Sequence, residues 1–107
     1  EVKVEMARNP NTDRSGNSFS ETTKLFVWSK GLADPKYKPE YVRRDACGAL
    51  IEWVNYGSTT THGWEIDHKL AIANGGGDEL ANLQPLQWEN NRTKGDSTSS
   101  KYCKITG

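Results

Sequence analysis

Residues 63–68 read GWEIDH, and this stretch, together with NGGGD at 74–78 and NLQPLQWENNRTK at 82–94, decides the fold that we expect for the chain. The first stretch predicts a short strand over 64–68, and the second predicts a glycine-rich loop. Proline suits the first turn of a helix and glycine suits its end, so Pro85 and Gly95 indicate a helix in the third stretch.

Two further elements are expected before this stretch. Residues 49–56 (ALIEWVNY) are rich in branched and aromatic side chains and predict a strand. Residues 19–30 begin at the S-x-x-E spacing of a capping box at Ser18, repeat apolar residues at helical intervals and precede a glycine, so they predict a helix. Residues 1–6 (EVKVEM) alternate valine with charge, which is typical of an edge strand or of a frayed terminus.

The length and composition indicate one small α+β domain over residues 1–107, with a core at 45–96 and peripheral or flexible ends at 1–17 and 97–107. Only 34% of the residues are hydrophobic, so the four Trp and four Tyr must supply much of the core. No apolar stretch approaches the roughly 20 residues of a membrane span, so no membrane partner is expected. Because the chain begins with Glu1, we expect a trimmed chain or a piece of a larger polypeptide. The oligomeric state is left open.

The charges sum to zero but are unevenly distributed. Residues 1–44 carry nine Lys or Arg against six Asp or Glu, residues 45–90 carry one against seven, and residues 91–107 carry four against one. An acidic middle between basic flanks fits a cation site bordered by an anion-binding surface, although a patchy soluble surface is the alternative. Cys47 and Cys103 allow one disulfide at most and leave the redox compartment open.

The pair Asp67-His68 combines a hard oxygen ligand with a base whose pKa lies near neutrality. Neighbouring side chains on a regular strand point to opposite faces, so the strand must end or distort if both are to serve one phosphate. Asn91, on the predicted helix, can add an amide oxygen to the same cation. Two oxygen ligands without nearby sulfur favour Mg²⁺ or Mn²⁺ over zinc. Taken singly, the Asp67-His68 pair could be two adjacent surface residues without a function, and Asn82 and Asn91 could be caps or turn residues.

Together these stretches resemble the HNH endonuclease family of ββα-metal nucleases. The resemblance covers about residues 45–96 and lies in GWEIDH (63–68), the glycines at 75–76, NLQPL (82–86), NNRTK (90–94) and the preceding DACGALI (45–51). The separations, fifteen residues from Asp67 to Asn82 and nine from Asn82 to Asn91, are similar to those in the HNH domain of RNA-guided CRISPR nucleases.

The resemblance implies a ββα-metal core, that is, a two-stranded antiparallel hairpin plus a helix, here with an additional N-terminal helix. It implies that Asp67 is a metal ligand, that His68 is the general base and that Asn82 braces the loop behind the His68 strand. Asn91 would be the second ligand, where other members use His, and this difference strengthens the expectation of one Mg²⁺, with Mn²⁺ as a substitute. Many members bind a structural zinc through paired cysteines, but Cys47 stands alone near such a place, so no structural zinc is expected.

The function implied is metal-dependent hydrolysis of DNA, most simply double-stranded DNA. The residues expected to hold flanking phosphates are Arg92, Lys94, Lys69, Arg43 and Arg44. Two alternatives remain open: a DNA-binding HNH-fold module of a larger protein with little cutting activity, and a ribonuclease or toxin on the same core. The expected location is intracellular, cytoplasmic or nucleoid-associated, with a secreted toxin as the other possibility.

Overall fold

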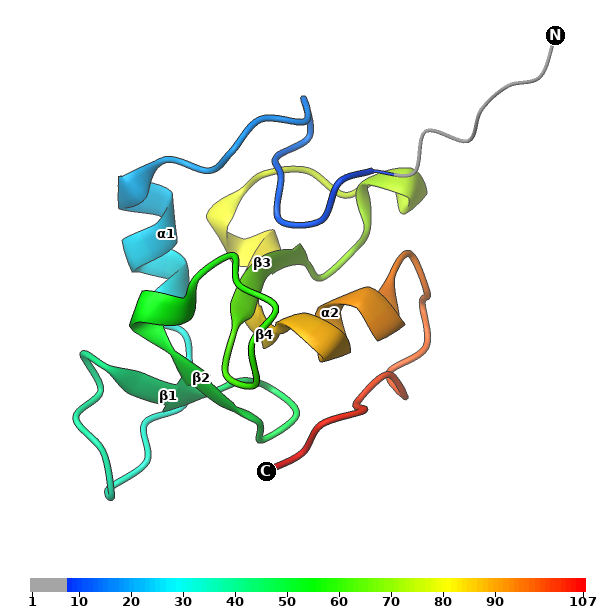
Figure 1. The fold of residues 1–107 in the computed structure, drawn as a ribbon. Coiled ribbons are helices and arrows are strands. Elements are labelled where there is room, and N and C mark those ends of the chain that lie inside the picture. Colours follow the sequence, from blue (N-terminus) through cyan, green and yellow to red (C-terminus); the bar gives the residue numbers. More distant parts are fainter. Residues whose placement is uncertain (1–7) are drawn as a thin grey trace, which may run out of the picture.

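Residues 8–107 form two helices and two antiparallel hairpins, and α1 precedes both hairpins in the chain (Figure 1). The computed structural model describes residues 8–107, so the edge strand or frayed terminus considered for 1–6 lies outside the described residues. The elements are α1 (Glu21–Trp28), β1 (Val42–Arg44), β2 (Leu50–Glu52), β3 (Trp64–His68), β4 (Leu83–Gln87), α2 (Trp88–Lys94) and the single 3-10 turns Trp53–Asn55, Ile72–Asn74 and Leu80–Asn82. The expectation of a small α+β fold with a helix near the N-terminus is confirmed.

Helix α1 lies inside the predicted range 19–30 but is shorter. Its N-cap is Ser20 rather than Ser18, because the Ser20 hydroxyl accepts the Thr23 N–H at 3.1 Å. The helix buries Val27 and Trp28 against the hairpins. The apolar spacing was therefore a reliable local signal, whereas the predicted cap at Ser18 was wrong by two residues.

The strand pairing differs from the predicted succession of two strands, a loop and a helix. Only Leu50–Glu52 of the predicted strand 49–56 is extended, and it pairs with β1, a segment in which the sequence indicated no strand. Strand β3, as predicted at 64–68, pairs instead with β4, which lies beyond the glycine-rich loop. The two hairpins are therefore separate sheets, β1–β2 and β3–β4.

The predicted end of the helix at Gly95 is confirmed, but its predicted start was wrong, because Pro85 lies in β4 opposite Ile66 and α2 begins at Trp88. The Ile66 N–H points away from β4, since it donates to Asn11 Oδ1 at 2.8 Å. Ile66 and Pro85 thus form a pair without mutual hydrogen bonds, and the ring nitrogen of Pro85 faces the outer edge, where no N–H is needed. The helix is capped instead by the Gln87 side chain, which accepts two N–H groups of its first turn.

The core gathers aromatic side chains where α1 meets both hairpins. The Trp28 and Trp64 rings lie 5.0 Å apart between centroids, and Tyr56 packs edge-on against Trp64 at 4.8 Å. The buried cluster consists of Val27, Trp28, Ile51, Trp64, Ile66 and Leu83. Trp28 and Trp64 therefore supply much of this small core, but the prediction for tyrosine was wrong, because Tyr56 is only partly buried and Tyr37 and Tyr41 are exposed. Within residues 8–107 no helix has the length and apolar character needed to cross a bilayer.

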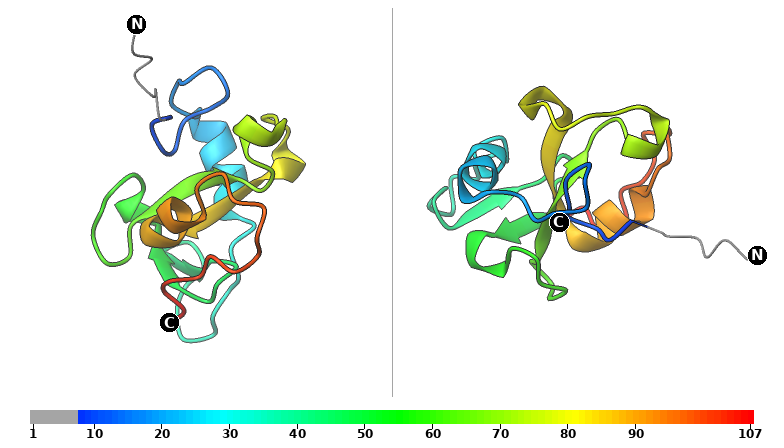
Figure 2. Two further views of the ribbon diagram at one scale, coloured as in Figure 1. Left: turned by 90° about the vertical axis from the view of Figure 1, so that its right-hand side faces the viewer. Right: turned by 90° about the horizontal axis from the view of Figure 1, so that it is seen from above.

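The C-terminal tail is attached to the domain by a disulfide. Cys47 and Cys103 are bonded, with their Cα atoms 5.5 Å apart. The fully buried Asn90 of α2 accepts the Lys104 and Ile105 N–H groups at 2.7 Å each and donates to the Ile105 carbonyl at 2.8 Å. Both contacts hold the tail, expected to be peripheral, along α2 (Figure 2).

Candidate functional site

Strand β3 carries the candidate site, and all five of its residues are buried. Glu65 and Asp67 are two residues apart on the strand, so they share the face that contacts α2. Asp67, His68 and Asn91 line one cavity of about 590 Å³. The remaining walls come from residues 8–12, the 71–73 turn, Arg92, Gly95 and Asp96. The structure thus brings the predicted ligands and the predicted base to a common space.

Asp67 is held by two side chains. Gln84 Nε2 donates to its Oδ2 at 2.9 Å, and Lys94 Nζ lies 3.2 Å from its Oδ1. Burial raises the pKa of the Asp67 carboxyl above its ordinary value, and the Gln84 hydrogen bond and the Lys94 charge offset this only in part. Each carboxylate oxygen accepts one protein donor, which leaves lone pairs on both oxygens for a further ligand.

Lys94 is buried and paired with Asp67, whereas the sequence predicted a lysine that holds a flanking DNA phosphate. Its side chain is 5% exposed, and its ammonium also donates to the His68 carbonyl at 2.8 Å. The register of α2 causes this, because Lys94 follows Asn91 by about one turn and so faces the same strand. The lysine is a structural partner of Asp67.

Glu65 orients Asn91. Asn91 Nδ2 donates to Glu65 Oε1 at 2.8 Å, and Arg92 donates to Glu65 Oε2 at 2.8 Å. Within residues 8–107, no donor is bonded to Asn91 Oδ1, so this oxygen is open to a ligand. The Arg92 guanidinium lies 5.2 Å from the Trp88 ring centroid and remains 44% exposed beside the cavity. Arg92 therefore keeps a surface from which it can meet a phosphate.

The donor chemistry of Asp67 and Asn91 fits a hard divalent cation, because both offer oxygen ligands. In the described part of the chain, no three His, Cys, Asp or Glu side chains are grouped so that they could hold a metal ion. The protein would thus supply two oxygens, and water or phosphate the rest. A cation on Asp67 would share that carboxylate with Lys94.

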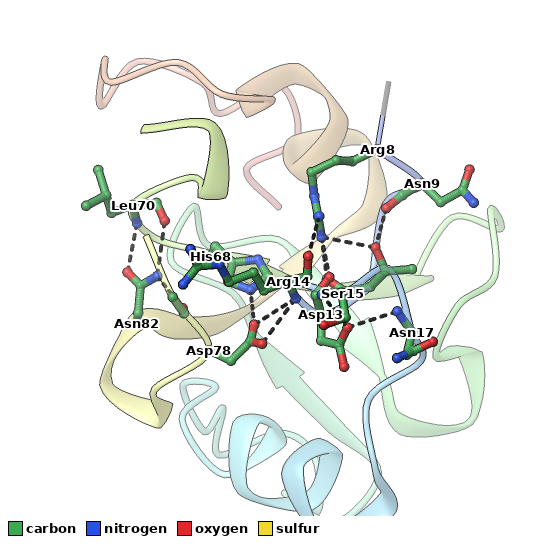
Figure 3. Close-up of polar contacts among 12 residues, drawn as sticks. Arg8, Asn9, Asp13, Arg14, Ser15, Asn17, His68, Leu70, Asp78 and Asn82 are labelled. Atoms are coloured by element: carbon green, nitrogen blue, oxygen red, sulfur yellow. Dashed lines mark hydrogen bonds and ion pairs between the residues drawn. The ribbon is translucent and has the colours of Figure 1, made fainter. Parts of the chain in front are cut away.

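His68, the last residue of β3, is paired with a carboxylate that the sequence did not indicate. Its Nε2 lies 2.7 Å from Asp78 Oδ1, and both Asp78 oxygens accept the Arg14 backbone N–H at 3.1 Å (Figure 3). Partial burial alone would raise the pKa of Asp78, but the hydrogen bonds from His68 and Arg14 outweigh it and lower the pKa. An ionised carboxylate only accepts, so Nε2 carries a proton, and in the neutral imidazole the lone pair then lies on Nδ1.

Asn82 closes the loop between β3 and β4. Its Oδ1 accepts the Leu70 N–H at 2.9 Å, and its Nδ2 donates to the carbonyls of Leu70 and Gly77 at 3.0 and 2.9 Å (Figure 3). Gly76 allows this closure, because a Cβ there would lie 1.7 Å from the Leu70 carbonyl oxygen. The loop therefore presents Asp78 to the end of β3.

The other predicted phosphate-binding residues do not line this cavity. Lys69 is exposed and lines a second cavity of about 500 Å³ on the Gln84 side of the hairpin. Arg43 and Arg44 belong to β1, where Arg43 donates to the Gly31 carbonyl at 2.9 Å and Arg44 pairs with Asp34 at 2.9 Å. These arginines therefore connect β1 to the segment 31–34 that follows α1.

Three participants were absent from the sequence-based site: Glu65, Asp78 and Arg14. Strand alternation could have indicated Glu65, because it shares a face with Asp67. Asp78 and Arg14 carry no local signal, since their contact joins residues 64 positions apart in the chain.

Comparison of the chain with protein-family models, curated proteins and solved structures yields no match. The functional argument therefore depends on the residues and their geometry.

Proposed function

We propose that this chain is a metal-dependent DNA endonuclease of the HNH type. His68 is the general base, and Asp67 and Asn91 are the ligands of one Mg²⁺, which Mn²⁺ can replace. The observation that carries the proposal is the shared cavity, in which a buried carboxylate, an amide oxygen and a carboxylate-bound imidazole meet. The succession of β3, β4 and α2 supports it, because it supplies strand, strand and helix in the order that the resemblance implies.

The chemistry follows from the Nε2–Asp78 contact, which leaves Nδ1 of a neutral His68 as the base. The lone pair on Nδ1 takes a proton from a water molecule as the water oxygen attacks phosphorus. The bond from phosphorus to the 3′-oxygen breaks, and protonation from solvent leaves a 3′-hydroxyl and a 5′-phosphate. A bound cation would polarise a phosphate oxygen and stabilise charge on the departing 3′-oxygen.

The residues around the cavity suggest how DNA is held. Arg92 is half-exposed at the cavity and can pair with a phosphate next to the scissile one. Lys69, exposed just after β3, can contact the backbone further along. Lys94 supports Asp67 and takes no part in holding phosphate. Phosphate contacts of this kind carry no base information, so the proposed binding is largely independent of sequence.

The disulfide bears on where the protein acts. Disulfides persist in oxidising compartments and are rare in the cytosol. The Cys47–Cys103 bond therefore favours a secreted or otherwise extracytoplasmic nuclease over the cytoplasmic location expected from the sequence.

A supercoiled-plasmid nicking assay tests the proposal. The wild-type chain is incubated with Mg²⁺, with Mn²⁺ and with excess EDTA, and with RNA in parallel. The proposal is supported if nicking requires the metal and is lost in His68→Ala. The matched control is His62→Ala, because His62 lies in the 57–63 loop and does not line the cavity. RNA cleavage alone would indicate a ribonuclease, and DNA binding without nicking would indicate a binding module.

A further inference from the structure

We infer, resting on the proposed function, that Asp78 is a positioning residue for His68 and that the backbone N–H of Arg14 holds Asp78 in place. The N-terminal segment 8–17 is then part of the site rather than a peripheral tail. No chemistry is assigned to this segment itself. Its role is to fix which nitrogen of the His68 ring meets the cavity.

The geometry of the pair carries the first step. His68 Nε2 and Asp78 Oδ1 are 2.7 Å apart, and the His68 side chain is only 9% exposed. The second torsion of histidine has broad, roughly two-fold preferences, so an unpartnered ring can present either nitrogen in one place. A carboxylate on Nε2 removes this freedom, and Nδ1, which has no hydrogen-bond partner within residues 8–107, remains for water.

Asp78 itself needs support, which is the second step. Its side chain is 41% exposed and follows three glycines, so the loop gives it little steric constraint. Two contacts supply the constraint: Asn82 holds the preceding Gly77 carbonyl at 2.9 Å, and the Arg14 N–H reaches both carboxylate oxygens at 3.1 Å. The carboxylate is therefore held from the loop and from the N-terminal segment.

The N-terminal segment is built to deliver that N–H. Asn11 Oδ1 accepts the outward N–H of Ile66, which attaches the segment to the free edge of β3. Arg8 donates to the Thr12 and Arg14 carbonyls at 3.1 and 3.4 Å, and Asp13 Oδ1 accepts from the Ser15 and Asn17 N–H groups at 2.9 Å each (Figure 3). This cross-linked turn places the Arg14 N–H against Asp78 of the 69–82 loop (Figure 3).

Position 14 allows a sharp test, because it is the second residue of a turn closed by the Gly16 N–H on the Asp13 carbonyl at 2.9 Å. Proline is favoured at this position of common turns. Arg14→Pro removes the N–H that Asp78 accepts, whereas Arg14→Ala removes the guanidinium and keeps the N–H. The comparison of the two variants isolates the backbone contact.

Steady-state plasmid nicking and thermal unfolding are measured for both Arg14 variants and for Asp78→Ala. Partners that orient metal-binding histidines are typically worth about 10- to 100-fold in activity, and we expect the same range for a histidine that acts as a base. We expect kcat to fall by that factor in Asp78→Ala relative to wild type, and in Arg14→Pro relative to Arg14→Ala, with little change in KM. A merely structural role would lower Tm and leave kcat of the folded protein unchanged, so kcat measured below Tm decides between the two roles.

A second readout does not depend on activity. In the metal-free protein, NMR should show a His68 ring N–H that is protected from solvent exchange, assigned by its loss in His68→Ala and its retention in His62→Ala. The signal should persist in Arg14→Ala, disappear in Asp78→Ala and weaken in Arg14→Pro. Its persistence unchanged in Asp78→Ala overturns the inference.

The two possible failures are distinguishable. If wild type nicks DNA and His68→Ala does not, but Asp78→Ala and Arg14→Pro match their references, the inference is wrong and the proposed function stands. If wild type cuts neither DNA nor RNA with Mg²⁺ or Mn²⁺, the proposed function fails, and the ring N–H still decides whether Asp78 and Arg14 fix the imidazole.

Discussion

Lys94 Nζ lies 3.2 Å from Asp67 Oδ1, and the two side chains are 5% and 6% exposed, so a buried ion pair joins the end of α2 to β3. Lys94 also donates to the His68 carbonyl at 2.8 Å. The carboxylate proposed to bind a metal therefore already has a cation beside it. This pairing reduces the cost of burying the Asp67 charge and fixes the residue in position before any metal arrives.

The ion pair predicts strong coupling between Asp67 and Lys94. Lys94→Met leaves a buried carboxylate without its cation, and we expect a loss of about 3 kcal/mol in the free energy of unfolding. The double variant Asp67→Ala/Lys94→Met should lose less than the sum of the single variants. Urea denaturation of the cycle measures this. Lys69→Met, at an exposed lysine, serves as the control, and additive losses would contradict the pairing.

Metal titration separates the proposed ligand from the proposed base. Asn91→Ala leaves the Asp67–Lys94 pair intact, and we expect its nicking activity to recover in part as Mn²⁺ is raised. His68→Ala should lose about two to four orders of magnitude in rate without recovery, because a general base is missing. Rescue of His68→Ala by metal, with none for Asn91→Ala, would reverse the two assignments.

The lowered pKa of Asp78 predicts a specific loss of stability in acid. A carboxyl whose pKa is depressed by folding adds stability above its ordinary pKa of 3.8, and this stability disappears as the pH falls through the lower folded value. Wild type should therefore exceed Asp78→Asn in unfolding free energy at neutral pH, and the difference should shrink below pH 3.8. Urea denaturation across pH measures it, and a difference independent of pH would refute the contact.

Loss of the disulfide should weaken the fold. The bond closes a separation of 56 residues, and the chain-entropy model assigns such a loop about 4 kcal/mol. We expect Cys47→Ser/Cys103→Ser to approach this loss in the free energy of unfolding, and reductant to have the same effect on wild type. If reductant leaves the wild-type denaturation curve in place, the tail is held by the Asn90 contacts alone.

Arg92 and Arg43 should differ in their effect on DNA binding. Arg92→Ala removes a half-exposed charge at the cavity, so the slope of log affinity against log salt should fall by about one unit. Arg43→Ala removes a side chain committed to the carbonyls of Ser29, Gly31 and Pro39, so the slope should stay unchanged. Fluorescence anisotropy at several salt concentrations measures both slopes, and equal effects would remove Arg92 from the proposed interface.

The sequence by itself determined the elements whose signals are local. The apolar spacing of residues 19–30 predicted α1, although not its cap, and the short stretch at 64–68 predicted β3. The residue types at 67, 68 and 91 also singled out the side chains that share the cavity. Helices and strands of this kind can be predicted because their signals, backbone preference and apolar spacing, arise from residues within a few positions of one another.

Only the tertiary structure decided the strand pairing and the partners of the site. Proline is favoured at a helix start, but Pro85 lies in β4. Its nitrogen faces the outer edge of that strand, where a missing N–H costs no hydrogen bond. Lys94 reads as a surface lysine until the register of α2 places it against Asp67. Asp78 meets His68 because Asn82 folds the loop back. In each case the partner comes from a segment that is distant in the sequence. Polar groups that become buried need a hydrogen-bond partner, and only the tertiary structure shows which distant group provides it.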